Sequence, residues 1–311
     1  MELITGENDK GRRLDRILRK ALPDYPLPLI HRLLRQGKIH VDGKQAQAQD
    51  RVDCGCKITI RSLKNPPDIA PSVENVSDRC PAPDILFQGK GLLAVNKPAG
   101  LAVHGPGSLD EMIRGFLAGK LPVSLSFKPG PLHRLDKPSS GIVVFSTSIE
   151  GARFFSALMR ERKIRKTYLA IVEGIILNDD TWEDELTRDV KIKKTFVSGS
   201  GTNNVENSGR KHAITRITPV SVKEKRTLIK AEIETGRTHQ IRAQAAAHGH
   251  PLAGDIKYGA VKHHSGGQVN GGKQAVSFFL HAWKLDFMEY HIEAPPPSVW
   301  PVFPEGNISL L

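Results

Sequence analysis

A proline-rich segment after the first fifth of the chain constrains how the remainder can fold. Positions 61–83 read RSLKNPPDIAPSVENVSDRCPAP, with five prolines and few large apolar residues. Its Pro-Pro step excludes helix, because proline lacks an amide hydrogen and restricts the residue before it. We therefore expect a small N-terminal domain at residues 1–62, a linker at 63–83 and a larger domain at 84–311, which suits a chain of 311 residues.

Composition narrows the class of protein further. No apolar run approaches the roughly 18 residues that cross a bilayer, and the first 13 residues lack the apolar stretch of a signal peptide. The odd number of cysteines (Cys54, Cys56 and Cys80) argues against a disulfide framework, and no second pair completes a zinc site. We expect a cytoplasmic protein with reduced cysteines.

The N-terminal region has the pattern of two short amphipathic helices followed by a small sheet. Apolar residues recur at helical spacing over 12–22 and again over 27–36. A strand is predicted at 38–41, a hairpin turn at Asp42-Gly43, and another strand at 56–60.

Basic residues are concentrated in the same region. The chain carries a net charge of +12, and residues 1–64 hold 14 Lys or Arg against 8 Asp or Glu. This excess suits a phosphate backbone, although a solvated surface would show the same charge. The stretches RLDRILRKAL and IHRLLRQGKIHVDGK resemble the S4 RNA-binding domain over residues 11–60. The resemblance implies RNA contacts from Arg12, Arg16, Arg32, Arg35 and Lys38.

Ionisable residues crowd one loop of the larger region. His133, Arg134 and Asp136 lie in PLHRLDKPSSG, shortly before an apolar strand predicted at 142–145. Polar groups in a loop at the edge of a strand are site candidates. A salt-bridged loop that merely closes the strand is the alternative interpretation.

A second group of donors follows a strand predicted at 228–233. The stretch TGRTHQIRAQ places Arg237, His239 and Arg242 at the start of a helix. An arginine beside Asp136 would keep that carboxylate ionised, and an ionised aspartate in a partly dry pocket can act as a nucleophile. Contact with an RNA backbone is the alternative for these arginines, more plausible for Arg237 than for Arg242.

Seven sequence blocks resemble those of the RluA-type pseudouridine synthases, which isomerise selected uridines in ribosomal and transfer RNA. They are LLAVNKPAGLAVHG, HRLDKPSSG, KTYLAIVEG, SGRKHAITRI, TGRTHQIRAQ, GHPLAGDIKYG and FLHAWKLDF, in this order across residues 84–290. The resemblance implies an α+β fold. A small S4-like α/β domain would precede a mixed, mostly antiparallel sheet around a central cleft.

The resemblance also implies roles for individual residues. Asp136 would be the catalytic nucleophile, Tyr168 would stack on the target base, and Arg242 would pair with Asp136. Tyr168 could instead be a core residue of the apolar strand at 169–172. Substrate contacts would come from Asn96, Lys97, His133, Arg134, Arg237 and His239. Gln244 stands where many members have histidine, which leaves a secondary contact at that position open.

The reaction sets expectations about cofactors and substrate. Moving the base from a nitrogen to a carbon linkage is an isomerisation, so we expect no cofactor and no metal. The sequence has no P-loop, dinucleotide fingerprint or metal-ligand cluster. The target base must leave its stack to reach Asp136. An S4-like domain joined to these blocks resembles the subgroup acting on 23S ribosomal RNA, and we expect a monomer.

Three other functions stay open at this point. They are a synthase acting on transfer RNA, a non-catalytic RNA-binding or ribosome-assembly protein that kept the fold, and a hydrolase. A binding protein would not need Asp136, Tyr168 and Arg242 together, and a hydrolase would need a second carboxylate that the blocks do not offer.

Overall fold

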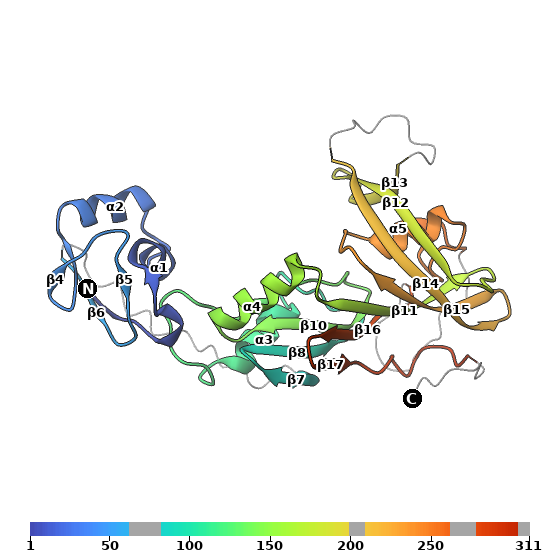
Figure 1. The fold of residues 1–311 in the computed structure, drawn as a ribbon, viewed down its shortest axis with the longest axis horizontal. Helices are drawn as coiled ribbons and strands as arrows, with labels where there is room; N and C mark the ends of the chain where they lie inside the picture. The colour runs from blue at the N-terminus through green and yellow to red at the C-terminus, as the bar shows by residue number, and fades with distance from the viewer. Residues whose placement is uncertain (62–81, 199–208, 262–277, 304–311) are drawn as a thin grey trace.

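The computed structural model describes residues 1–61, 82–198, 209–261 and 278–303. Almost all of the linker expected at 63–83 lies outside the described residues. The described parts form an elongated molecule with the N-terminal domain at one end and the larger sheet along the rest (Figure 1). No helix among the residues described is long and apolar enough to cross a bilayer.

The N-terminal domain packs two helices against a small antiparallel sheet. Its elements are β1 (Glu2–Ile4), η1 (Glu7–Asp9), β2 (Arg12–Arg13), α1 (Leu14–Ala21), α2 (Leu27–Arg35), β3 (Ile39–Val41), β4 (Lys44–Gln45), β5 (Arg51–Val52) and β6 (Lys57–Ile60). The main sheet has the order β1-β6-β3-β4, and β2 pairs with β5. Both helices turn leucines and isoleucines into one core with β3 and β6. The sequence predicted both helices, β3, β6 and the turn between β3 and β4, but not β1.

The larger domain is built on one sheet of 11 strands. Its elements are β7 (Ile85–Gly89), β8 (Leu92–Lys97), α3 (Leu109–Leu117), β9 (Gly130–Pro131), β10 (Ser140–Ser146), α4 (Ile149–Arg160), β11 (Arg165–Glu173), β12 (Asp180–Asp189), β13 (Lys194–Val197), β14 (Lys211–Lys223), β15 (Arg226–Ile233), α5 (Gln240–Ala247), η3 (Ile256–Tyr258), β16 (Leu280–Phe287) and β17 (Tyr290–Glu293). The order is β13-β12-β14-β15-β11-β16-β10-β8-β7, with β17 beside β16 and β9 beside β10. β10 and β16 run parallel, whereas the other paired strands run antiparallel. This confirms the α+β class and the mixed, mostly antiparallel sheet.

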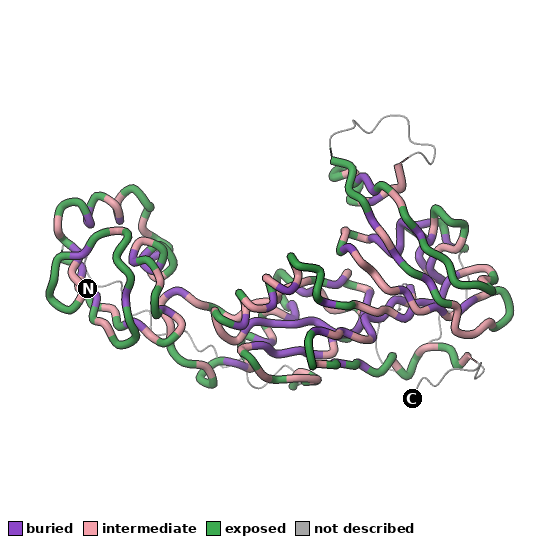
Figure 2. The backbone as a smooth tube through the Cα atoms, viewed as in Figure 1, coloured by how far each residue is buried: buried purple, intermediate pink, exposed green. Residues whose placement is uncertain are grey.

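Helices cover both faces of the β8–β10 half of the sheet. Because side chains alternate along a strand, Leu92 and Ala94 of β8 face α4, whereas Leu93 and Val95 face α3. Figure 2 shows these strands buried between their neighbours. Helix α5 covers the β12–β15 half, where its apolar residues join a third core. Tyr168 of β11 contacts both the α3-side core and the α5-side core, so it marks where the two halves meet.

Candidate active site

Asp136 lies on the loop that leads into β10, and backbone hydrogen bonds fix that loop on both sides. The carbonyl of Asp136 accepts a bond from the Ser139 amide at 3.1 Å. The next carbonyl, that of Lys137, accepts a bond from the Gly100 amide at 2.8 Å. The loop after β8 and the loop before β10 are therefore joined directly beneath Asp136.

Lys97 supports the same junction from inside the fold. Its side chain has no exposed surface, and its ammonium donates to the carbonyls of Pro98, Leu101 and Lys137 at 2.9, 2.8 and 3.3 Å. Burial lowers the pKa of Lys97 to about 8, against the opposing effect of the Asp136 charge. The sequence suggested a substrate contact for Lys97. The structure instead places it as a buried brace, because all three of these partners are backbone oxygens.

Arg242 stands between two carboxylates. Its Nη1 donates to Asp136 Oδ2 at 2.8 Å, while Nε and Nη2 donate to the two oxygens of Asp255 at 2.6 and 2.9 Å. The rings of Tyr258 and Phe278 lie 4.8 and 4.3 Å from the guanidinium carbon. Burial alone would lower the pKa of Arg242, but the two carboxylates outweigh it and raise that pKa. The Arg242 guanidinium is therefore charged, and it is oriented by hydrogen bonds to both Asp136 and Asp255.

The exposure of the two carboxylates separates their tasks. The Asp255 side chain is 2% exposed, whereas that of Asp136 is 19% exposed. A buried aspartate that accepts two bonds from one guanidinium orients it. The partly exposed Asp136 forms an ion pair with the same guanidinium and can be reached from outside.

His239 approaches Asp136 from the start of α5. Its Nε2 lies 3.7 Å from Asp136 Oδ1, and its Nδ1 lies 2.9 Å from the Tyr258 hydroxyl oxygen. The Thr195 amide already donates to that oxygen at 2.9 Å, so the Tyr258 hydroxyl hydrogen is free to point at Nδ1. Burial lowers the pKa of His239 against the opposing effect of Asp136, which favours a neutral ring. This assignment leaves an N–H on Nε2, on the side of Asp136.

Tyr168 lies on β11 with small residues beside it. Its directly opposite cross-strand neighbours are Ala231 on β15 and Ala282 on β16. Burial raises the pKa of Tyr168, and the nearby negative charge of Asp136 raises it further. The ring therefore carries a neutral phenol at the meeting point of the two halves.

Two residues expected to contact substrate are hydrogen-bonded within the protein instead. His133 Nε2 accepts the Val144 amide at 3.1 Å, and its ring stacks on Phe155 in the core beneath α4. Burial lowers the pKa of His133 to about 3, so the ring is neutral. Asn96 donates from Nδ2 to Asp84 at 3.0 Å. Both side chains hold the sheet together, because their partners belong to neighbouring segments of it.

Arg134, Arg237 and Gln244 are the remaining residues for which the sequence suggested or left open a contact. Arg134 is exposed two residues before Asp136. Arg237 donates from Nε to the His212 carbonyl at 3.0 Å, on the β14 side. Gln244, whose role the sequence left open, is fully buried and bonds to Thr215, the Trp182 carbonyl and Asp184. It fixes α5 to β12 and β14.

Sequence reasoning missed Asp255 and Tyr258. Both lie in GHPLAGDIKYG, which was noted as a block without assigning its members. The available signal was a second carboxylate close to a glycine turn, 13 residues after Arg242. Their approach to Arg242 depends on the fold of η3 against α5, which local periodicity does not encode.

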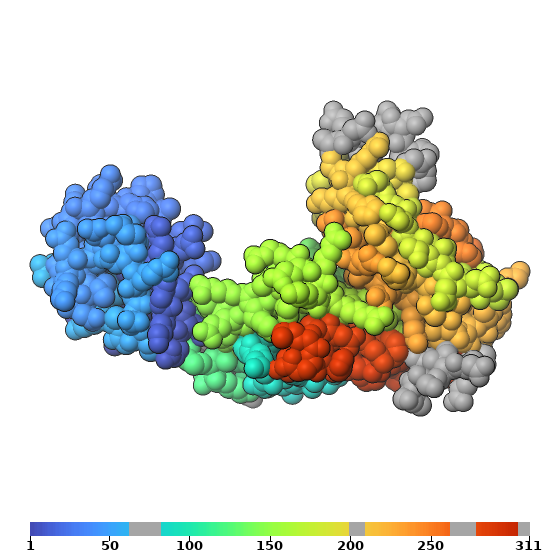
Figure 3. Space-filling view, in the orientation of Figure 1, coloured from blue at the N-terminus to red at the C-terminus, as the bar shows by residue number. Residues whose placement is uncertain are grey.

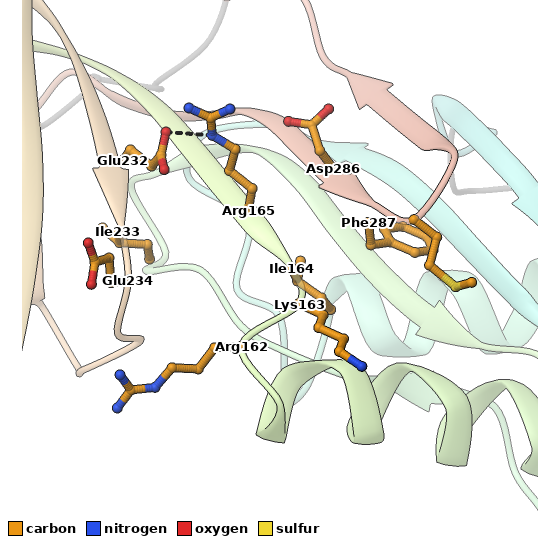
Figure 4. Close-up of a pocket in the computed structure, with 10 residues that line it drawn as sticks. Arg162, Lys163, Ile164, Arg165, Glu232, Ile233, Glu234, Asp286 and Phe287 are labelled. Atoms are coloured by element: carbon orange, nitrogen blue, oxygen red, sulfur yellow. Dashed lines mark hydrogen bonds and ion pairs between the residues drawn. The ribbon is translucent and has the colours of Figure 1, made fainter.

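A hollow of about 440 Å³ lies elsewhere on the domain. Its polar lining comprises Arg162, Lys163, Arg165, Glu232, Glu234 and Asp286 (Figure 4). Arg165 and Glu232 are joined across it at 2.6 Å. Its apolar lining is Ile164, Ile233, Phe287 and Met288, and its lining residues include neither Asp136 nor Tyr168 nor Arg242. This hollow is therefore separate from the Asp136 site.

Comparison with known proteins decides the family. The RNA pseudouridylate synthase family profile matches residues 91–247, just over half of the chain. The chain belongs to this family. It is an RNA pseudouridine synthase of the RluA type, and the S4 domain profile matches residues 12–55.

Curated relatives extend the match across both domains. "Ribosomal large subunit pseudouridine synthase D" of Neisseria meningitidis is 32% identical over 307 residues, covering 93% of this chain and 76% of the relative. "Ribosomal large subunit pseudouridine synthase C" of Pasteurella multocida is 31% identical, covering 92% and 85%. A solved structure, "Human RNA Pseudouridylate Synthase Domain Containing 4", is 22% identical with a TM-score of 0.54, covering 69% of this chain and 89% of that chain, and supports the fold.

Proposed function

We propose that the protein converts specific uridines of 23S ribosomal RNA into pseudouridine, with Asp136 as the nucleophile acting on a flipped-out base. One observation carries this proposal: the ion pair of 2.8 Å between Asp136 and Arg242, in which the carboxylate keeps 19% of its surface exposed. The substrate class comes from the curated relatives, whose names describe synthases of the ribosomal large subunit.

The proposed chemistry follows from a carboxylate, that of Asp136, which is paired with the Arg242 guanidinium and partly exposed to solvent. Asp136 forms a transient bond from one oxygen to a carbon of the nucleotide, and the bond between C1′ and N1 of uridine breaks. The base then turns, C1′ bonds to C5, the bond to Asp136 breaks and restores the carboxylate, the C5 proton leaves and N1 gains a proton. The guanidinium of Arg242 holds Asp136 Oδ2 in place as the carboxylate charge is lost and regained, and His239 Nε2 lies 3.7 Å from Oδ1.

Tyr168 supplies the surface on which the base rests. Flipping a nucleotide costs a few kcal/mol, and stacking on an aromatic ring offsets part of that cost. A neutral phenol suits this role because it brings no second negative charge beside Asp136. Arg134, exposed on the same loop, is placed to contact the RNA backbone next to the flipped nucleotide.

The N-terminal domain supplies affinity for folded RNA. Arg16, Arg32, Arg35 and Lys38 are exposed, and the last three lie on or directly after α2. These cations would displace counterions from phosphates on binding. Arg12 was expected in the same group. Its guanidinium instead donates to Ser126 of the larger domain, so Arg12 is not among the proposed RNA contacts.

Three further properties belong to the same proposal. The S4 domain occupies residues 1–62 and the catalytic domain residues 84–311, joined by 63–83. The enzyme works as a monomer, since Asp136, Tyr168 and Arg242 all come from one chain. It acts in the cytoplasm, where ribosomal RNA is processed.

Mapping pseudouridines in cellular RNA tests the function directly. We expect one or more pseudouridines of 23S ribosomal RNA to disappear when the gene is deleted and to return when it is restored. Loss confined to transfer RNA would contradict the proposed substrate. An unchanged map in both RNA classes would favour the non-catalytic alternative.

A further inference from the structure

Asp9 is a fully buried carboxylate at the junction of the two domains. Its Oδ1 accepts bonds from the Ser124 hydroxyl at 2.8 Å, the Ser126 amide at 3.0 Å and the Ser126 hydroxyl. Its Oδ2 accepts the Leu125 amide at 2.9 Å and, from its own domain, the Gly6 amide at 2.9 Å. Four of the five donors therefore come from residues 124–126 of the catalytic domain.

Neighbouring contacts support the same geometry. Arg12 Nη1 donates to the Ser126 hydroxyl at 2.6 Å and to its carbonyl at 3.1 Å. Asn8 Oδ1 accepts the amide of Ile149, the first residue of α4, at 2.8 Å. Leu125 packs against the core of the N-terminal domain. Figure 3 shows the two domains meeting over a small area at this end of the catalytic domain.

The contacts at this junction allow little change in the orientation of the N-terminal domain relative to the catalytic domain. A Cβ at Gly6 would collide with the carbonyl oxygen of Val123, so the two backbones are in close contact. A buried charge is expensive unless donors surround it, and the donors to Asp9 come from fixed backbone and hydroxyl positions. Burial alone would raise the pKa of Asp9, but its hydrogen bonds, those of Ser126 foremost, outweigh that effect and lower the pKa. Asp9 is therefore ionised at neutral pH.

We propose that Asp9, with residues 124–126, is an interdomain latch that selects the target uridine by fixing the position of the S4 domain relative to Asp136. The inference rests on the proposed function, because the distance between the RNA bound by α2 and the nucleotide at Asp136 matters only in such an enzyme. The latch leaves each domain with its own core, so opening it changes the geometry and not the fold. Asp9 is a positioning residue, since it contacts neither substrate nor reacting atoms.

The first test needs no RNA. In Asp9→Asn an amide N–H₂ replaces one acceptor oxygen among donors, while the size of the side chain is kept. Small-angle X-ray scattering of the full chain is compared for the wild type, Asp9→Asn, Ser126→Ala and the control Asp24→Asn, an exposed aspartate of the same domain. We expect the distance distribution to broaden and its maximum to increase in Asp9→Asn, less so in Ser126→Ala, and not in the control. An unchanged distribution in Asp9→Asn would overturn the latch.

The second test asks whether the latch selects the target. The same variants are assayed on a 23S ribosomal RNA transcript and on a short hairpin that carries the mapped uridine but is too small to reach both domains. For Asp9→Asn we expect kcat/KM on the transcript to fall at least tenfold, pseudouridine to appear at neighbouring uridines, and kcat on the hairpin to change less than twofold.

The outcomes separate the latch from the proposed function. Equal losses on both RNAs would show a merely structural role for Asp9, and no loss on either would show that the domain position does not select the target. Both results overturn the proposal. If the wild type modifies neither RNA, the proposed function fails, whereas the scattering experiment still reports on the interdomain contact.

Discussion

At the scale of single residues, the site depends on one guanidinium that serves two carboxylates. Asp255 takes two of the bonds from Arg242 and Asp136 takes one. The resemblance to known synthases named Asp136 and Arg242 as a pair, and the fold added the buried Asp255 that orients Arg242. In the proposed mechanism, Asp136 depends on Asp255, because Asp255 fixes the guanidinium that Asp136 contacts.

Asp255→Asn should lower both stability and activity. The substitution leaves a buried guanidinium with one charged partner fewer, so we expect a loss of about 3 kcal/mol in the free energy of unfolding. A displacement of about 1 Å at Asp136 would cost about 100-fold in kcat. Urea unfolding and turnover on RNA measure the two effects. The exposed Asp179→Asn is the control, and equal effects of the two substitutions would contradict the orienting role.

His133 should lower the free energy of unfolding of the enzyme at acidic pH. Its pKa is about 3 in the folded chain, below the ordinary value of 6.5, so the unfolded chain binds a proton that the folded chain does not. The His133 contribution is therefore fully present above about pH 6.5 and falls as the pH drops from there toward 3. Between pH 7 and 5 this costs roughly 2 kcal/mol.

The matched variant for this effect is His133→Gln, which keeps an acceptor for the Val144 amide and cannot titrate. Urea unfolding at pH 7 and 5 should show a smaller pH dependence for the variant than for the wild type. An identical pH dependence would contradict a buried, neutral histidine.

At the scale of elements, the parallel contact between β10 and β16 holds the Asp136 loop against the rest of the sheet. Gly141 lies in that contact with φ +107°, and a Cβ there would collide with the backbone of Ala282. The glycine of the HRLDKPSSG block is thus explained by the approach of two strands. Ser140 and His281 add a hydrogen bond of 2.8 Å between the same strands.

Gly141→Ala should therefore separate the strands. We expect a loss of about 3 kcal/mol or more in the free energy of unfolding, in the range of severe backbone and packing defects. Gly130→Ala is the control, because a Cβ at Gly130 would meet no atom within 4 Å and its φ is not positive. Thermal unfolding of both variants measures the difference. A Gly141→Ala enzyme as stable as the control would contradict the tight contact.

The helices and strands also show how much of the fold could be predicted from the sequence. Helical spacing identified α1 and α2, which each bury one face, and apolar runs identified β8 and β10, which are buried on both faces. The strand β15 and the start of α5 were identified on either side of the turn at Thr235-Gly236. The pattern missed β1, whose three residues are too few to show alternation and which forms by pairing with β6. It also assigned His133 and Lys97 to substrate, since charge and loop position do not show whether a side chain turns inward. Asp9 and Arg12 gave no signal of an interdomain role for the same reason.

At the scale of the whole molecule, the proposed RNA contacts are divided between two domains. The proposed S4 contacts lie on α1, on α2 and just after it, while the proposed nucleophile Asp136 lies in the other domain. The affinity for RNA that the N-terminal domain contributes should therefore depend on salt concentration. The turnover of bound RNA in the catalytic domain should not depend on those contacts.

Replacing Arg32 and Arg35 together by glutamine tests this division. If each neutralises one phosphate, the slope of log Kd against log salt concentration should fall by about 1.4 to 1.8 in magnitude, and affinity at moderate salt should weaken. The turnover of bound RNA should change little. Filter binding across a salt series gives the slope, with Arg216→Gln as a control because Arg216 is engaged with Glu234. An unchanged slope would place the phosphate contacts elsewhere.

The most direct test of the whole account is pseudouridine formation by Asp136→Asn on a 23S ribosomal RNA transcript under single-turnover conditions. The substitution keeps the shape of the side chain and removes the charge that Arg242 holds. The account predicts a rate at least about 1,000-fold below that of the wild type, as for loss of a nucleophile, with RNA affinity nearly unchanged and Asp179→Asn fully active. Turnover by Asp136→Asn at a rate near that of the wild type would contradict it.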